Sequence, residues 1–148
     1  AMAVGMAMAE AHMAAIFNKE CFNVVDNYTY VLMGDGCMME GASYEAASLA
    51  GTQKLNKLIA IYDSNRITIE GSTDIAFTEN VAARFGAMGW QVINVENGED
   101  IVAISLALEE ARIEAEKPSL IIVHTDSGWP GVRLPYWRNC CMSSMVKP

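Results

Sequence analysis

The sequence predicts an α/β protein built on a parallel sheet with helices on both faces. Short apolar stretches rich in β-branched residues alternate along the chain with longer stretches of helical spacing. Strands separated by helices in this way indicate βαβ units and parallel pairing. The hydrophobic content of 52% is high for 148 residues, and it indicates either a sheet covered by helices or apolar surface that meets a partner.

The first half of the chain supplies two helices and two strands. Residues Met2–Lys19 are rich in Ala and Met, a composition typical of a buried helix. The β-rich stretch Tyr28–Met33 follows and ends at Gly34. Helical spacing returns over Met39–Lys54 with several small residues, and Leu58–Tyr62 is an apolar strand.

The second half begins with a capped helix and a third strand. The spacing of apolar residues predicts a helix over Thr78–Met88, with Thr78 as its N-cap and Glu79 in its first turn. The stretch Trp90–Val95 is apolar enough to form the next strand. This order continues the alternation of helix and strand.

A final helix and strand complete a single predicted domain. Helical spacing runs over Glu99–Glu116, and Pro118 precedes a strand at Ser119–His124. A chain of this size suits one domain, which can bury about 70% of its unfolded surface, and we expect that domain to cover residues 1–126. Residues 127–148 have no periodicity and hold two of the three Trp and three of the four Pro, so we expect an irregular, divergent tail there.

The charge and hydropathy of the chain argue against nucleic-acid binding and against a membrane span. The formal net charge is -8, and the ten Lys and Arg form no basic stripe, which argues against nucleic-acid binding. An acidic protein can still bind a phosphate-bearing ligand when a metal ion bridges the two. No stretch approaches about eighteen strongly apolar residues, so we expect no membrane span.

The cysteines and histidines predict neither a disulfide framework nor a zinc site. The four cysteines are Cys21, Cys37, Cys140 and Cys141. Their spacing matches no paired metal-ligand pattern and no secreted disulfide pattern, which favours thiols in a reducing cytoplasm. The two histidines, His12 and His124, are far apart in sequence and are interpreted as an ordinary helix residue and a strand-end residue.

Polar residues at the ends of two consecutive strands form the candidate site. Gly34-Asp35-Gly36 follows the first strand and Asn65 follows the second. Ligands of parallel sheets bind at the carboxyl ends of the strands. A hard cation such as Mg²⁺ takes oxygen ligands and keeps positions for phosphates. The carboxylate of Asp35, the amide oxygen of Asn65 and a main-chain carbonyl just after Asn65 would supply such a shell.

The glycines and the following helix favour a diphosphate beside this metal. Gly34 and Gly36 carry no Cβ that would obstruct an anion approaching the backbone. The helix predicted to begin near Met39 would aim free amide groups toward that anion. Gly-Asp-Gly alone is also typical of an ordinary turn, and it is the addition of Asn65 that favours a ligand site.

Two longer motifs resemble those of a known family. They are Gly34-Asp35-Gly36-Cys37-Met38-Met39-Glu40-Gly41 and Tyr62-Asp63-Ser64-Asn65-Arg66-Ile67-Thr68-Ile69-Glu70-Gly71. Together they resemble the thiamine-diphosphate motif of transketolase, and the similarity covers residues 1 to about 123. The Cys-x-x-Glu-Gly and Tyr-Asp-x-Asn-x-Ile-x-Ile-x-Gly details favour transketolase over other thiamine-diphosphate enzymes. The resemblance implies a thiamine-diphosphate-binding fold of the diphosphate-binding type.

The resemblance assigns the metal and the diphosphate to particular residues. Asp35, Asn65 and the main-chain oxygen of Ile67 would hold Mg²⁺ or Ca²⁺. Gly36 and Asn65 would contact the diphosphate of thiamine diphosphate, next to Gly34. These assignments are implied by the family and by the matching positions.

Three further positions follow from the same resemblance. Ile69 would lie against the cofactor and help to hold its bent shape. Glu40 and Glu45 match acidic positions near the family's subunit interface, where Glu40 would join a carboxylate network that links two cofactor sites. A carboxylate favoured by the helix dipole is the alternative interpretation of Glu40.

Other parts of a transketolase site have no counterpart in this sequence. In the family, N-terminal histidines bind substrate and cofactor, a Gly-rich segment precedes the position of Ala1, and the catalytic glutamate lies in a pyrimidine-binding domain of the partner subunit. We therefore predict no catalytic residue in this chain. After His124, this chain has Ser127 where the family has an Ile and Pro130 where the family has the second Gly of a Gly-x-Gly turn. The cofactor-binding His that the family has some dozen residues later has no counterpart in this sequence.

Two functions remain open from the sequence. The chain is either a transketolase-like domain or a truncated, non-catalytic or repurposed binding domain. As the former it would bind Mg²⁺ and the diphosphate, and contribute to two-carbon ketol transfer between sugar phosphates when a pyrimidine-binding domain complements it. The first function predicts apolar assembly surface on the helices after Gly5 and Glu40, in a homo-oligomer or with a partner chain. The second predicts that the tail covers that surface.

Overall fold

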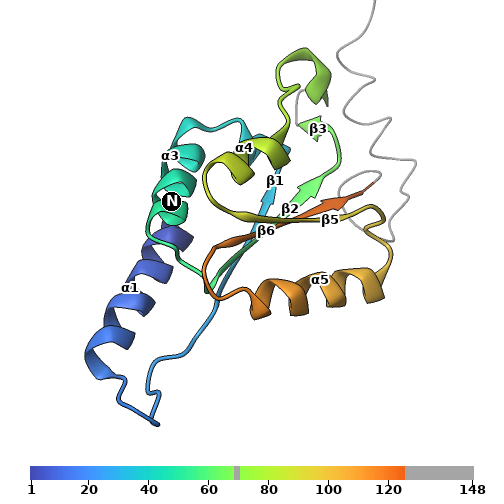
Figure 1. Cartoon of the computed structure of the whole chain (residues 1–148). Helices are drawn as coiled ribbons and strands as arrows, with labels where there is room; N and C mark the ends of the chain where they lie inside the picture. The colour runs from blue at the N-terminus through green and yellow to red at the C-terminus, as the bar shows by residue number, and fades with distance from the viewer. Residues whose placement is uncertain (69–70, 126–148) are drawn as a thin grey trace, which may run out of the picture.

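The computed structural model describes residues 1–68 and 71–125. Its centre is a four-stranded parallel sheet in the order β1-β2-β6-β5 (Figure 1). The strands are β1 (Thr29–Gly34), β2 (Leu58–Ser64), β5 (Gln91–Val95) and β6 (Ser119–His124). The parallel sheet confirms the predicted fold class. Two short strands, β3 (Ile67–Thr68) and β4 (Gly71–Ser72), pair antiparallel just after β2.

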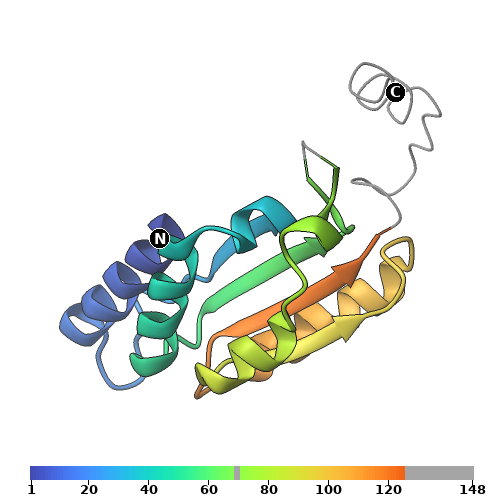
Figure 2. The same ribbon diagram turned by 90° about the horizontal axis from the view of Figure 1, so that it is seen from above.

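Helices cover both faces of the sheet (Figures 1 and 2). One face carries α1 (Met2–Phe17), α3 (Gly41–Thr52) and α4 (Val81–Ala87), and the other carries α5 (Ile101–Ile113). Two short helices complete the structure, α2 (Asp35–Met38) and the 3₁₀ turn η1 (Thr73–Ile75).

The two faces hold separate hydrophobic clusters. The cluster under α1, α3 and α4 includes Val4, Ala47, Leu58, Phe85 and Trp90, all buried. The cluster under α5 includes Ile59, Ile93, Ala107, Ala111 and Ile121. Successive residues of β2 therefore serve opposite clusters, as the two-residue period of a strand requires. Because both faces are covered, the strand is apolar without alternation.

Close contacts between α3 and the segment around the end of α4 account for the presence of Gly51 and for the position of Trp90. A Cβ on Gly51 would collide with the carbonyl of Met88, so only glycine permits this approach. Trp90 was predicted as part of the third strand but precedes β5. Its indole nitrogen donates to the carbonyl of Ala47 at 2.8 Å, and its ring packs edge-on against Phe85.

Two helix starts differ from the sequence-based prediction. The helix predicted from Met39 is divided: α2 already begins at Asp35, and the extended backbone of Glu40 interrupts the helix before α3. Thr78 was the wrong N-cap. The Asn80 side chain accepts from the amide of Ala83 and caps α4, while Glu79 precedes the helix and pairs with Arg84.

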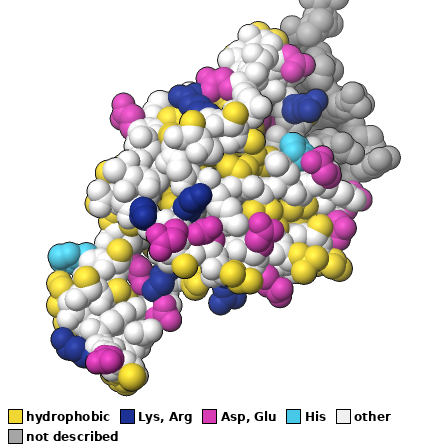
Figure 3. Space-filling view, viewed as in Figure 1, with side chains coloured by type: hydrophobic (Ala, Val, Ile, Leu, Met, Phe, Trp, Pro, Cys, Tyr) yellow, Lys and Arg dark blue, Asp and Glu magenta, His cyan; other side chains and the backbone are white. Residues whose placement is uncertain are grey.

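The outer surfaces of several helices are apolar. Figure 3 shows hydrophobic side chains on the exposed side of α5, where Ile101, Leu106 and Ile113 are 77%, 60% and 81% exposed. Met6 and Ile16 of α1 are more than half exposed as well. No helix in the described part of the chain is long and apolar enough to cross a membrane. The predicted tail lies outside the described residues.

Candidate functional site

The predicted site residues lie at the carboxyl ends of β1 and β2. Gly34 is the last residue of β1 and lies opposite Asp63 of β2 in the parallel register. Asp35 follows at the start of α2, and Asn65 follows the end of β2. The sheet thus brings two segments together that are thirty residues apart, as their positions after neighbouring strands predicted.

The carboxylate of Asp35 is the centre of this region. It is only 4% exposed. One oxygen accepts the hydroxyl of Tyr62 at 2.5 Å, and the other accepts the amides of Asn65 and Arg66 at 3.2 and 2.9 Å. Every one of these donors is neutral. The carboxylate is therefore oriented by hydrogen bonds, while its charge has no cationic partner among residues 1–68 and 71–125.

Tyr62 is held as a hydrogen-bond donor by its surroundings. Burial raises the pKa of its hydroxyl above the ordinary tyrosine value, and the hydrogen bond to Asp35 raises the pKa further. The hydroxyl stays protonated over the physiological range. It therefore donates to one oxygen of Asp35 and fixes the orientation of that carboxylate.

Asn65 and Ile67 belong to the same tight turn. The amide oxygen of Asn65 accepts from the backbone nitrogen of Ile67 at 3.0 Å, and its amide nitrogen donates to Asp63 at 3.1 Å. Asp63 in turn accepts from the hydroxyl of Thr125, just after β6. These bonds fix the side chain of Asn65 beside the turn that contacts Asp35. The structure thus brings all three predicted metal ligands into one region.

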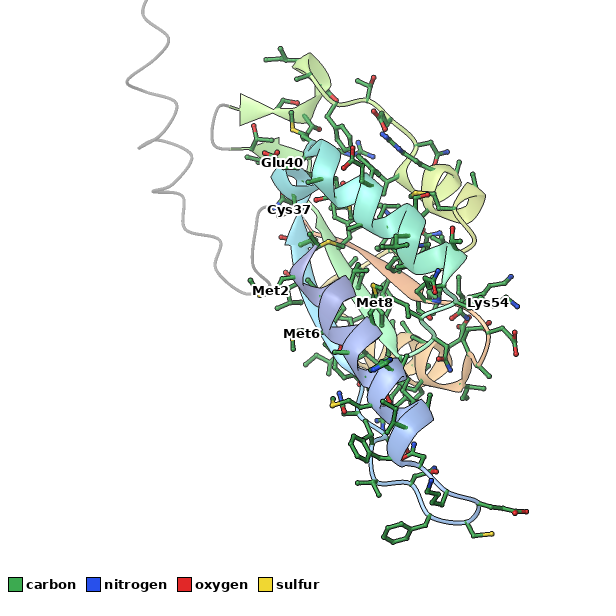
Figure 4. The ribbon with its side chains drawn as sticks, turned by 90° about the vertical axis from the view of Figure 1, so that its left-hand side faces the viewer. Met2, Met6, Met8, Cys37, Glu40 and Lys54 are labelled. Carbon is green, nitrogen blue, oxygen red and sulfur yellow. The ribbon has the colours of Figure 1, made fainter. Side chains whose placement is uncertain are left out.

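The remaining predicted positions are placed in different ways. A Cβ built on Gly34 or Gly36 would meet nothing within 4 Å, so the backbone there borders open space. Glu40 is exposed at the N-cap position of α3, and its side chain makes no capping hydrogen bond. Figure 4 shows Glu40 and Cys37 at the same end of the molecule. Ile69 lies outside the described residues.

A cavity of about 360 Å³ adjoins Asp35. It lies between the ends of β2, β5 and β6 and the segment that leads into α4. Asp35, Tyr62, Arg66, Asn80 and His124 are among its lining residues. Sequence reasoning treated His124 as an ordinary strand-end residue and gave Arg66 no role. The signal that could have placed His124 at the site is its position as the last residue of a strand, because ligands bind at the carboxyl ends of parallel strands.

The donor set suits a hard cation. A carboxylate offers about four lone-pair positions, and three hydrogen bonds to Asp35 leave capacity for one more partner. An amide oxygen and a main-chain carbonyl from Asn65 and Ile67 would complete a partial oxygen shell. Within the described ranges, no three His, Cys, Asp or Glu side chains gather as a metal site. A cation here would therefore rely on one carboxylate and on ligand phosphates.

The fold and the position of the polar groups agree with the family that the sequence matches. The chain is an α/β domain whose polar groups gather at the ends of parallel strands, the usual place for a bound cofactor. The family described as the thiamine diphosphate binding domain of transketolase matches residues 1–134. The chain belongs to this family.

Individual relatives support this assignment. Transketolase 1 of Saccharomyces cerevisiae is 56% identical over 128 residues, which are 86% of this chain and 19% of the relative. The transketolase of Geobacillus stearothermophilus is 54% identical over 87% of this chain and 19% of its own length. A solved transketolase from Leishmania mexicana superposes with a TM-score of 0.82 at 53% identity, over 83% of this chain and 18% of that one. The chain thus spans about a fifth of these relatives.

Proposed function

We propose that this chain binds Mg²⁺ and, through it, the diphosphate of thiamine diphosphate. The buried carboxylate of Asp35 carries the proposal, because its three hydrogen-bond donors are all neutral. A buried charge is costly unless a counter-charge compensates it. A divalent cation at Asp35 would supply that charge and would attract an anionic ligand to an acidic protein.

Each remaining residue has a defined part in this proposal. Asn65 and the main-chain oxygen of Ile67 complete the protein ligands of Mg²⁺, or of Ca²⁺ in its place. Gly34 and Gly36 border open space and let the diphosphate approach the backbone. Ile69 is proposed to lie against the cofactor, and Glu40 to take part in contacts between subunits.

The proposed activity is two-carbon ketol transfer between sugar phosphates, completed by a pyrimidine-binding domain. When bound, thiamine diphosphate supplies the carbanion chemistry, and this chain supplies anchoring and orientation. A transketolase structure from Pichia stipitis contains sedoheptulose 7-phosphate, and it is 49% identical to this chain over 83% of it. The apolar outer faces of α1 and α5 support assembly with another polypeptide. We expect a cytoplasmic location, in keeping with the free thiols of Cys21 and Cys37.

Titration calorimetry with thiamine diphosphate tests the metal and diphosphate site. We expect the wild-type chain to bind in the presence of Mg²⁺ and to bind much more weakly when the metal is chelated. Asp35→Ala removes the carboxylate and should abolish the Mg²⁺-dependent binding. Asp35→Asn keeps an acceptor for the hydrogen bonds and should abolish it too, which separates loss of charge from loss of fold.

Asp74→Ala provides a matched control. Asp74 is an exposed carboxylate that lines the same cavity, and it is not one of the proposed ligands. Its removal should leave binding unchanged or make it tighter, because one negative charge fewer faces the anion. Equal binding by wild type and Asp35→Asn would remove the site assignment.

A further inference from the structure

Arg66 occupies a backbone conformation that arginine rarely adopts. Its φ is 59°, in the left-handed region that favours glycine. The Arg66 amide donates to Asp35 at 2.9 Å, so the turn that holds the residue is part of the candidate site. Unfavourable backbone conformations of this kind tend to persist at binding sites, where the surroundings fix them. The presence of a long cationic side chain at this position therefore calls for a reason.

The charges around the cavity supply that reason. Arg66 is the only Lys or Arg among its described lining residues, which also include Asp35, Asp74 and Glu79. Glu79 is paired with Arg84, whereas the guanidinium of Arg66 makes no ion pair with any residue of 1–68 or 71–125. Arg66, which is exposed and has no ion-pair partner in the described part of the chain, thus lines a cavity in which carboxylates predominate.

We propose that Arg66 is an anion-binding residue of this site, with its guanidinium holding a phosphate of the diphosphate ligand. The inference rests on the proposed function and adds a second cationic contact to the one that the metal provides. A guanidinium presents its N–H groups in a planar fork that matches two phosphate oxygens. Binding of a diphosphate therefore combines a metal-dependent contact at Asp35 with a metal-independent contact at Arg66.

Lys54 makes a matched control possible. It is also a cationic residue with positive φ, 51°, and it lies just after α3 and its C-cap, away from Glu40 and Cys37 (Figure 4). Replacing Lys54 or Arg66 by glycine relieves the same backbone conformation and removes one positive charge. The two substitutions differ in whether the lost charge belongs to a cavity-lining residue, and Lys54→Gly also removes an exposed ion pair with Glu116, which contributes little to stability.

The experiment is calorimetric titration of the full chain with inorganic pyrophosphate, with Mg²⁺ and with a chelator. We expect Arg66→Gly to weaken pyrophosphate binding about tenfold in both conditions, the loss of one charge-assisted contact. Arg66→Lys keeps the charge without the fork and should lose less. Lys54→Gly should bind as the wild type does. The melting temperatures of both glycine variants should not fall, because glycine suits a positive φ.

Each outcome separates this inference from the proposed function. Wild-type chain that shows no Mg²⁺-dependent binding of thiamine diphosphate contradicts the proposed function. If Arg66→Gly binds pyrophosphate as tightly as the wild type does, only the role of Arg66 is overturned. A melting temperature that falls in Arg66→Gly would indicate a structural role, and Arg66→Asn, which tolerates the same backbone and lacks the charge, then decides. Equal weakening by Lys54→Gly would show a general charge effect and overturn the inference.

Discussion

Two carboxylates, one at each end of the sheet, are buried to the same extent and differ in their partners. Asp35 at the carboxyl end and Glu10 of α1 are each 4% exposed. Glu10 accepts from the ammonium of Lys57, just before β2, at 2.7 Å. Among the described residues, Asp35 accepts from a hydroxyl and two backbone amides. Within residues 1–68 and 71–125, one carboxylate is compensated by a cation of the protein and the other is not.

The difference separates structural charge from functional charge. A buried ion pair is complete within the fold, so Glu10 has no need of a ligand. Neutral donors orient a carboxylate without cancelling its charge, so Asp35 keeps an attraction for a cation from solution. Both acids are equally hidden from water, and burial alone would not distinguish them.

The largest effect on stability is expected when Lys57 is removed. Lys57→Met leaves Glu10 buried without its counter-charge and should lower the free energy of unfolding by about 3 kcal/mol. Urea denaturation measures it. Lys54→Met is the control, because Lys54 and its partner Glu116 are 69% and 71% exposed and the change should be small. A loss below about 1 kcal/mol for Lys57→Met would contradict the contrast between the two carboxylates.

The ion pair of Glu10 and Lys57 shows that the sequence does not reveal which side chains will pair. Glu10 and Lys57 are 47 residues apart and belong to no motif. The pairing of Tyr62 with Asp35 is similarly long-range. The proximity of Asp35 and Asn65 was predictable because strand order and strand ends fix it. Which groups pair with or donate to each carboxylate depends on tertiary packing. No local sequence pattern encodes these partners.

The strands were easier to predict than the helix starts. The prediction of Ser119–His124 agrees with β6 at both ends. The prediction for β2 ended at Tyr62, yet Asp63 and Ser64 continue the pairing with β6, because backbone ladders do not require apolar side chains. Capping by Asn80 depends on which side chain meets a free amide, and Thr78 and Asn80 are both suitable by type.

A smaller effect is expected from the hydroxyl of Tyr62. Tyr62→Phe removes one of three donors to Asp35 and should lower the free energy of unfolding by about 1 kcal/mol at neutral pH. Its pH dependence gives a sharper result. Burial and the hydrogen bond to Asp35 raise the pKa of Tyr62 in the folded state, so folding favours the protonated form. The wild-type advantage is complete below the unfolded tyrosine pKa of about 10 and declines as the pH rises above it.

Urea denaturation of both proteins at neutral and alkaline pH measures that decline. The difference between wild type and Tyr62→Phe should shrink above about pH 10. Tyr44, whose pKa burial also raises, is present in both proteins and cancels in the comparison. A difference that stays constant with pH would mean that folding does not raise the pKa of the Tyr62 hydroxyl.

The smallest effect is expected from a third carboxylate, which shares Lys57 with Glu10. Asp26 lies 2.7 Å from the Lys57 ammonium, the same distance as Glu10, but its side chain is 60% exposed. Burial lowers the pKa of Lys57, while hydrogen bonds to Asp26 and Glu10 outweigh this and raise it overall. Distance and partner are thus matched, while the two acids differ strongly in burial.

Asp26→Asn should therefore change the free energy of unfolding by less than about 0.5 kcal/mol, because water screens an exposed ion pair. Glu10→Gln should have a much larger effect, since it leaves the Lys57 ammonium without its buried partner. Urea denaturation at low and high salt measures both, and only the small Asp26 contribution should vanish with salt. Equal losses for the two substitutions would mean that burial does not set the strength of a charge pair in this fold. The interpretation of Asp35 as an uncompensated charge held for a ligand would then lose its physical basis.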